Sequence, residues 1–350
     1  MTFNFFGYSL RFYVTVPHFL YVFRHGTLYR NNFEHGNIID LYGYQIGRWN
    51  MRRYWGYLSA LTVAVIFGVW YSFDKILLQY LHPLALAGLT YVVAALFLFL
   101  IRFSPIQTRV LNILNREDAV ENFNSPRDYA LVFITAILGS VIAPSIYLTG
   151  LNRITAVNAA LLMNVQAFFI ILIGIFFLKE AVQKKDILGF IFLLSGAIFL
   201  TLNNGGGLSA NQSLYGSLLV ILAAFFWSMD TSLSKFLSNK RDLVLISALK
   251  CSIGGFSLIV ISLVLGLNLE LPLSQIPYLL FIGLFCISFS LVLTYFSIRE
   301  IGSTRTGSIF AFDSLFGAIF AFIILSEPFT ALQLLFGLFM LAGVFILYKK

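Results

Sequence analysis

Residues 129–151 read YALVFITAILGSVIAPSIYLTGL, and residues 154–178 read ITAVNAALLMNVQAFFIILIGIFFL. Neither run contains a charged side chain, and only Asn152 and Arg153 separate them. An α-helix needs roughly 20 predominantly apolar residues to cross the hydrocarbon core of a bilayer. Each run therefore predicts one transmembrane helix. A transmembrane β-strand would alternate apolar and polar residues, and these runs do not.

The composition of the whole chain agrees with these two runs. Of its 350 residues, 59% are hydrophobic and only 11% are charged, whereas charged residues make up roughly 25% of a soluble domain. Lipid must therefore surround most of the apolar surface. The predicted fold class is all-α, a polytopic membrane protein with ten transmembrane helices. The predicted spans are 57–78, 84–101, 129–151, 155–178, 187–203, 214–236, 243–267, 276–298, 306–325 and 331–348.

Basic residues are distributed unevenly between alternate connections of the ten spans. With the N-terminus inside, the inner segments from position 48 onward hold seventeen Lys and Arg residues, and the outer loops hold only Arg153. Cytoplasmic loops carry an excess of Lys and Arg. We therefore predict a multi-pass protein of the cytoplasmic (plasma) membrane with both termini cytoplasmic. This asymmetry accounts for the net charge of +8, so no nucleic-acid partner is predicted.

Residues 1–53 differ from the remainder because they contain no clean span. Their best apolar run, at positions 2–23, is interrupted by Arg11 and Pro17. We interpret residues 1–53 as an N-terminal extension, either poorly ordered or upstream of the true start, since Met51 directly precedes the first span. The alternative is an amphipathic segment that lies on the membrane surface.

An internal repeat divides the membrane region into two halves. We predict a first five-helix repeat at 54–203, a linker at 204–213 and a second five-helix repeat at 214–350. The alternative is chance agreement between Leu-rich helices. Because five spans per half is an odd number, the halves are predicted to have opposite orientations, an architecture of secondary transporters. The pairs that chance explains least are Gly56/Gly216 and Lys75/Lys235, 160 positions apart, and Glu180/Glu327 and Gly196/Gly343, 147 positions apart.

Two short motifs carry a family resemblance. Leu178-Lys179-Glu180 is followed by Gly196, and Ser326-Glu327-Pro328 is followed by Gly343. Together they resemble the paired signature of the drug/metabolite transporter superfamily, in its EamA-like branch, over about residues 54–348. The resemblance implies a ten-helix bundle and the export or exchange of small metabolites, such as amino acids or their relatives. It does not specify the substrate.

The sequence departs from this family at two positions. The family usually has a proline thirteen residues before each signature glutamate, and this chain has Ala167 and Ser314 there. These replacements remove the sequence signal for the family's helix kinks. Pro144, five residues after Gly139, predicts a kink elsewhere, in the third span.

Polar side chains within the spans are candidates for a substrate pathway, because a charge inside a membrane is costly and by default functional. Spans 1, 4, 6 and 9 are expected to surround a midplane cavity that is acidic on the side of the second half. Such a cavity favours a solute with a cationic or ammonium group, or a proton. The predicted pathway residues are Trp70, Asn164, Gln166, Trp227, Asp230 and Asp313.

Each candidate also has a structural interpretation. Asp230 and Lys250 come from neighbouring spans at similar depth and could neutralise each other as an ion pair. Asn164 and Gln166 could bond neighbouring helices, and Trp227 could anchor the protein at the membrane interface. Further structural interpretations are headgroup contact by the Lys75 side chain and helix capping of the next helix by Glu180 and Glu327.

Two other classes of function fit the sequence less well. His82 is the only histidine after Met51, so histidine-based catalysis or metal binding is not expected. We predict no enzyme activity, no metal site and no cofactor. A channel or a structural membrane protein is the alternative, but neither needs an inverted duplication. The predicted partners are the lipid bilayer, a small-molecule substrate and, as a further candidate, protons.

Overall fold

The computed structural model describes residues 2–5, 8–11, 15–16, 19–24, 27–31, 35–105, 126–178, 184–202, 210–238, 242–328 and 330–348. The chain divides into two compact units, Met1–Tyr54 and Trp55–Lys350.

The first unit contains short strands, where the sequence predicted little regular structure. Strands β1 (Thr2–Phe5) and β2 (Tyr8–Arg11) form an antiparallel pair. Strands β3 (Thr15–Val16), β4 (Phe19–Arg24) and β5 (Thr27–Asn31) form an antiparallel sheet in that order. Thr, Val, Phe and Tyr are frequent in these segments and favour strands. Helix α1 (His35–Leu77) begins in this unit and continues into the second.

The second unit is helical throughout its described residues, without a strand, and this confirms the all-α class there. Eight helices are long and apolar enough to cross a membrane, and two shorter apolar helices lie at Ile187–Leu202 and Ala331–Leu347. The elements after α1 are α2 (Pro83–Phe103), α4 (Pro126–Ala136), η1 (Ile137–Ile142), α5 (Ala143–Leu151), α6 (Ala156–Leu162), α7 (Val165–Leu178), α8 (Lys184–Leu202), α9 (Ala210–Ser238), α10 (Leu243–Val264), η2 (Leu273–Gln275), α11 (Ile276–Phe281), η3 (Ile282–Phe289), α12 (Ser290–Ile301), α13 (Ser303–Phe310), α14 (Phe312–Leu325) and α15 (Ala331–Tyr348).

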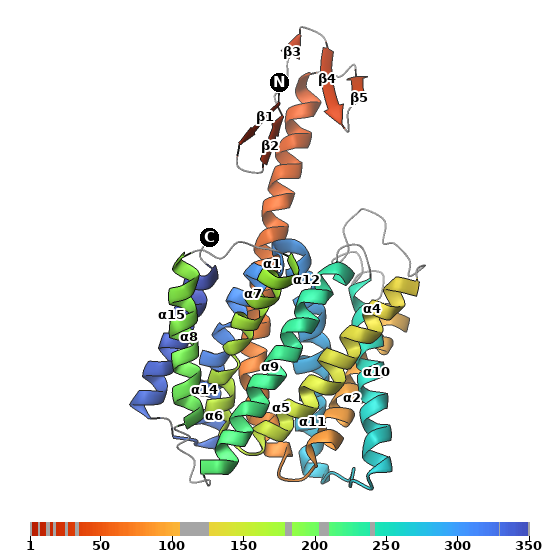
Figure 1. Cartoon of the computed structure of the whole chain (residues 1–350). Coiled ribbons are helices and arrows are strands. Elements are labelled where there is room, and N and C mark those ends of the chain that lie inside the picture. Colours follow the sequence, from red (N-terminus) through yellow and green to blue (C-terminus); the bar gives the residue numbers. More distant parts are fainter. Residues whose placement is uncertain are drawn as a thin grey trace. The chain divides into compact units, whose positions relative to one another are not determined.

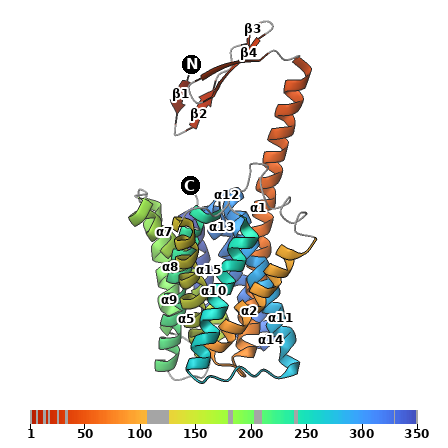
Figure 2. The same ribbon diagram turned by 90° about the vertical axis from the view of Figure 1, so that its right-hand side faces the viewer.

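Helices of this unit pack in pairs that are distant in sequence. Helix α2 contacts α10, α8 contacts α15, and α6 contacts α14 (Figure 1). Helix α9 lies against both α5 and α7. In the perpendicular view of Figure 2, the helices run roughly parallel to one another as one bundle. Their apolar side chains form a continuous core that includes Tyr147, Leu151 and Leu162.

Two glycines of the predicted repeat signature lie where α8 meets α15. A Cβ atom on Gly343 would lie 2.7 Å from the carbonyl oxygen of Gly189, and one on Gly196 would lie 2.8 Å from that of Phe336. Both distances are too short for a real side chain. Small residues allow membrane helices to approach closely, so these glycines set the spacing of the two helices.

Two spans change from α- to π-helical geometry. The π-helix η1 ends two residues before Pro144, which has no N–H group to donate to an earlier carbonyl. The π-helix η3 has no such proline, but Ser288 Oγ donates to Gly283 O at 2.7 Å and Ser290 Oγ donates to Phe285 O at 2.9 Å. Both bonds satisfy carbonyls five residues back. Single-turn π-helices occur frequently at functional sites.

Two other spans are interrupted. A break at Met163 and Asn164 separates α6 from α7, and a break at Ala311 separates α13 from α14. Ala167 and Ser314 stand where the family usually has proline, so the sequence predicted no bends there. The helices are nevertheless interrupted three or four residues before these positions. Asn164 Nδ2 donates to Ser314 Oγ at 2.8 Å, and this bond joins the two interrupted spans.

Two predicted roles at the helix ends were wrong. The Lys75 ammonium group donates to Leu151 O at 2.7 Å and to Ile154 O at 2.6 Å instead of extending to the headgroups. Glu327 Oε2 accepts a hydrogen bond from Val157 N at 3.1 Å, so Glu327 caps α6 and not the helix that follows it. Glu180 lies outside the described residues.

The next helix, α15, has a cap of its own. Thr330 N donates to Gln333 Oε1 at 2.7 Å, and Gln333 N donates to Thr330 Oγ1 at 3.2 Å. This reciprocal pair is a capping box. Gln333 Nε2 also donates to Asn158 Oδ1 at 2.8 Å, and this bond connects α15 to α6.

Candidate functional site: a central aromatic cavity

A cavity of about 110 Å³ lies within the helical unit. It is bounded by side chains from both halves of the chain, including parts of both π-helices. Five of the six predicted pathway residues line it: Trp70, Gln166, Trp227, Asp230 and Asp313. The sixth, Asn164, lines an adjoining cavity of about 20 Å³, which Gln166 and Asp313 also border.

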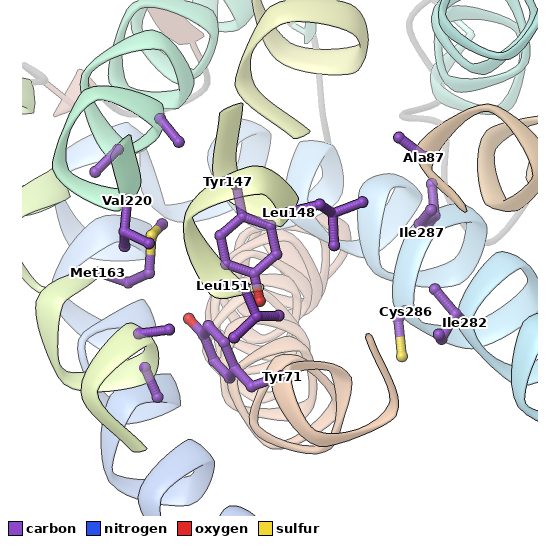
Figure 3. Packing of buried hydrophobic residues seen from close by; sticks show 14 of the residues in the cluster. Tyr71, Ala87, Tyr147, Leu148, Leu151, Met163, Val220, Ile282, Cys286 and Ile287 are labelled. Carbon is purple, nitrogen blue, oxygen red and sulfur yellow. The ribbon is translucent and has the colours of Figure 1, made fainter. Parts of the chain in front are cut away.

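Aromatic rings form one wall of the cavity. The ring centroids of Trp70 and Trp227 are 5.8 Å apart, and each lies within 5.5 Å of the Tyr147 ring. Figure 3 shows Tyr71 beside Tyr147, and the centroids of the two rings are 6.2 Å apart. The faces of such rings attract cations. The wall can therefore hold an ammonium group as well as apolar carbon.

The π-helix η1 supplies a backbone acceptor to this wall. Trp227 Nε1 donates to Gly139 O at 3.0 Å, and the Tyr91 hydroxyl donates to the same oxygen at 3.2 Å. Trp227 is thus held inside the bundle, and its interpretation as an interfacial anchor was wrong. A Cβ atom at Gly139 would overlap the Asp230 carboxylate, so only glycine fits at this point.

Asp230 and Lys250 form a buried ion pair at one side of the cavity. Lys250 Nζ lies 2.5 Å from Asp230 Oδ1, and the two side chains are only 1% and 12% exposed. Ser234 Oγ donates to the same carboxylate oxygen at 3.1 Å and lies 3.3 Å from the Tyr295 hydroxyl. Because Lys250 neutralises Asp230, this side is less acidic than the sequence suggested.

Asp313 is the other carboxyl group that lines the cavity. It is buried, in the first turn of α14 directly after the break at Ala311. The partial positive charge of a helix N-terminus stabilises a carboxylate at such a position. Tyr71 interacts with the Asp313 side chain. Among the described residues, no Lys or Arg forms an ion pair with Asp313, so it is the acidic group available to a ligand.

Sequence reasoning missed several cavity residues. Tyr71, Tyr91 and Thr231 were not selected, because Tyr and Thr are common on buried helix faces and carry no charge. The repeat contained one unused signal. Gly139 and Ser140 of η1 correspond to Cys286 and Ile287 of η3 at an offset of 147, and all four line the cavity.

These features define a polytopic helical membrane protein with a central cavity that is aromatic on one side and carries a buried ion pair on another. The family model for the EamA-like transporter family matches the chain twice, at residues 54–202 and 214–349. The chain therefore belongs to the EamA-like transporter family.

Curated relatives of this chain are named as transporters. An uncharacterized transporter of Methanothermobacter thermautotrophicus is 49% identical over 299 residues, which are 85% of this chain and 87% of that protein. The uncharacterized transporter YoaV of Bacillus subtilis is 25% identical over 83% of this chain and 95% of its own length. A probable amino-acid metabolite efflux pump of Salmonella typhimurium is 27% identical over 53% of this chain and 54% of its own length.

A solved crystal structure has a similar fold. It superposes with a TM-score of 0.60 and 13% sequence identity, over 83% of this chain and 95% of the other. At that identity the similarity concerns the fold alone.

Proposed function

We propose that this protein is a secondary transporter that moves a small organic solute across the cytoplasmic membrane by alternating access, as efflux or exchange. The observation that carries the proposal is the central cavity. The sequence analysis selected polar or aromatic side chains on four otherwise apolar spans, and these side chains line the same space. Transporters with internal repeats bind substrate near the midplane, between the repeats.

The fold supports an inverted repeat of five plus five spans. Helices α2 and α10 are equivalent at an offset of 160 and pack together, as α8 and α15 do at an offset of 147. The π-helices η1 and η3 also correspond at the offset of 147, and so do the two helix breaks. Contact between equivalent elements is expected when a pseudo-two-fold axis relates the halves. The eight long spans and the two shorter helices would then form the ten-helix bundle.

The cavity supports a small solute that carries a cationic or ammonium group. Its volume of about 110 Å³ is below the roughly 300–1,000 Å³ of drug-sized pockets. When Asp313 is ionised, its carboxylate would supply the negative charge, and the ring faces of Trp70 and Trp227 would supply a cation-binding wall. The similarity to a probable amino-acid metabolite efflux pump agrees with a solute of this kind.

Flux through purified protein in proteoliposomes tests the proposal. A panel of radiolabelled amines, amino acids and organic acids is screened for uptake and for counterflow against the same unlabelled solute. A transporter shows saturation and counterflow for at least one solute, whereas a channel shows neither. Asp313→Asn should reduce the flux of that solute at least about tenfold, if it removes roughly 1.4 kcal/mol of binding. Linear, non-saturating flux for every solute would refute the proposal.

The other acidic cavity residue provides a second comparison. Asp230→Asn is expected to reduce flux by disturbing the ion pair, and Glu270→Gln, which alters an exposed carboxyl group, is expected to leave it unchanged. If Asp313→Asn and Asp230→Asn both retained wild-type flux from pH 5 to pH 8, the cavity would not be the substrate site.

A further inference from the structure

A second carboxyl group is buried near the cavity without an ion-pair partner among the described residues. Asp74 on α1 is 1% exposed, and its Oδ2 atom has no hydrogen-bond partner. The side chain of Trp70, one turn earlier, bonds to the carboxyl group. The neighbouring Lys75 does not neutralise it, since the ammonium group is bound to Leu151 O and Ile154 O.

The two halves place their acidic residues one helical turn apart, because at the offset of 160 Asp74 corresponds to Ser234 and Asp230 corresponds to Trp70. In the second half, Asp230 has Lys250 as a close partner. In the first half, the position that corresponds to Lys250 is Thr90, at an offset of 160, and Thr90 bonds to carbonyls of its own helix. The first half therefore has no lysine equivalent to Lys250, and Asp74 forms no ion pair among the described residues. An unpaired charge within a membrane is costly, so a purely structural role does not explain an aspartate here.

Asp74 lies within an uncharged polar environment. Among the described residues, the groups on which its charge acts include Tyr71 on α1, Tyr147 on α5, Tyr91 on α2 and Cys286 on η3. All four are neutral when protonated. The Tyr147 hydroxyl, like Asp74 Oδ2, has no hydrogen-bond partner among the described residues. Each of these two buried oxygen atoms can therefore take part in one further hydrogen bond, as it would after a proton binds.

Asp313 acts on the same two tyrosines from the cavity side. Both Asp74 and Asp313 interact with Tyr71 and with Tyr147. The two rings are 6.2 Å apart between centroids (Figure 3). Asp313, Tyr71 and Tyr147 line the cavity, whereas Asp74 does not. The four side chains therefore form one polar cluster that reaches from the cavity into the buried part of α1.

We propose that Asp74 and Asp313, together with the Tyr71 and Tyr147 hydroxyl groups, form a proton-binding site that couples proton movement to transport. Hydronium in the cavity water gives its proton to a carboxylate oxygen and becomes water, and the carboxylate becomes a neutral carboxylic acid. Buried acidic side chains form proton relays in membrane pumps and transporters. Asp230 is outside this site because Lys250 already provides its counter-charge. The coupling rests on the proposed transport function, but proton binding does not.

Infrared spectroscopy tests proton binding without a solute. Purified, reconstituted wild-type protein should retain the C=O stretching band of protonated carboxyl groups at pH 7, where exposed acids are ionised. Asp74→Asn should remove about half of that band, if the two acids contribute equally, and Asp313→Asn a similar share. Glu270→Gln, the exposed control, should leave it unchanged. Should Asp74→Asn fail to fold, Asp74→Ser introduces the residue found at the corresponding position 234. An unchanged band in a folded Asp74 variant would overturn the proposal.

Proton flux tests the coupling. Proteoliposomes that contain a pH-sensitive dye are supplied with a solute that shows counterflow in the panel screen. In the wild type, solute entry should move protons, and a pH gradient should accelerate solute uptake. In Asp74→Asn, the ratio of the uptake rates with and without the gradient should fall to about 1. A gradient effect that persists in Asp74→Asn would refute the coupling while leaving transport established. If no solute in the panel moves, transport itself fails, and the infrared result still decides whether Asp74 binds a proton.

Discussion

The buried ion pair between Asp230 and Lys250 leads to a quantitative prediction. Replacing Lys250 with Met keeps an unbranched apolar stem but leaves the Asp230 carboxylate without its cation, which lies 2.5 Å away in the wild type. Removing one partner of a buried ion pair costs about 3–5 kcal/mol. Ser234 still donates one hydrogen bond to the carboxylate, so we expect a loss near the lower end, about 3 kcal/mol.

A compensating substitution should limit this loss. The double variant Asp230→Asn with Lys250→Met removes the charge altogether and should recover to within about 1.5 kcal/mol of the wild type.

Equilibrium unfolding in mixed detergent measures these differences. Leu249→Met, on the adjacent half-buried position of α10, controls for the effect of introducing methionine and should change stability by less than about 1.5 kcal/mol. The reasoning is refuted if the double variant is as unstable as Lys250→Met alone.

Three further predictions concern packing, helix ends and topology. Gly343→Leu should destabilise the contact of α8 with α15 by about 1–3 kcal/mol through overpacking, measured by unfolding in detergent, whereas Ala342→Leu on the exposed side should have little effect. Lys75→Met should loosen the connection between α5 and α6. A cysteine introduced at Asn152 should therefore react faster with a thiol reagent in this variant than the same cysteine does in a protein that keeps Lys75; equal rates would contradict this. With both termini cytoplasmic, a single cysteine at Lys184 should not react with an impermeant reagent in intact cells, and labelling there would refute the proposed topology.

Much of the fold could be predicted because the bilayer limits the possible structures. In lipid, a spanning segment must satisfy all its backbone hydrogen bonds, so long uncharged runs become helices. The run at 129–151 is helical from residue 129 to residue 151, as expected, but its centre is a π-helix. Pro144 indicated a kink there. Nothing comparable in the sequence indicated η3, where serine hydroxyl groups stabilise the geometry.

The candidate site could be predicted only in part. Trp70, Gln166, Trp227, Asp230 and Asp313 were selected because polar or aromatic side chains on apolar helices are exceptional. Their position around one cavity depends on how the helices rotate and pack, which a single sequence does not state. Tyr71 and Tyr91 were overlooked for the same reason.

By itself, the sequence determined the helical class and the approximate spans, because these depend on hydropathy along the chain, and it predicted an internal repeat. Only the tertiary structure decided which acidic residues have partners. Asp230 lies beside Lys250, whereas Asp74 lies beside a different lysine whose ammonium group is bound to Leu151 O and Ile154 O. Sequence proximity does not decide whether two charges meet. Their interaction depends on the distance between the charged atoms and on the dielectric around them, and the packing of helices fixes both.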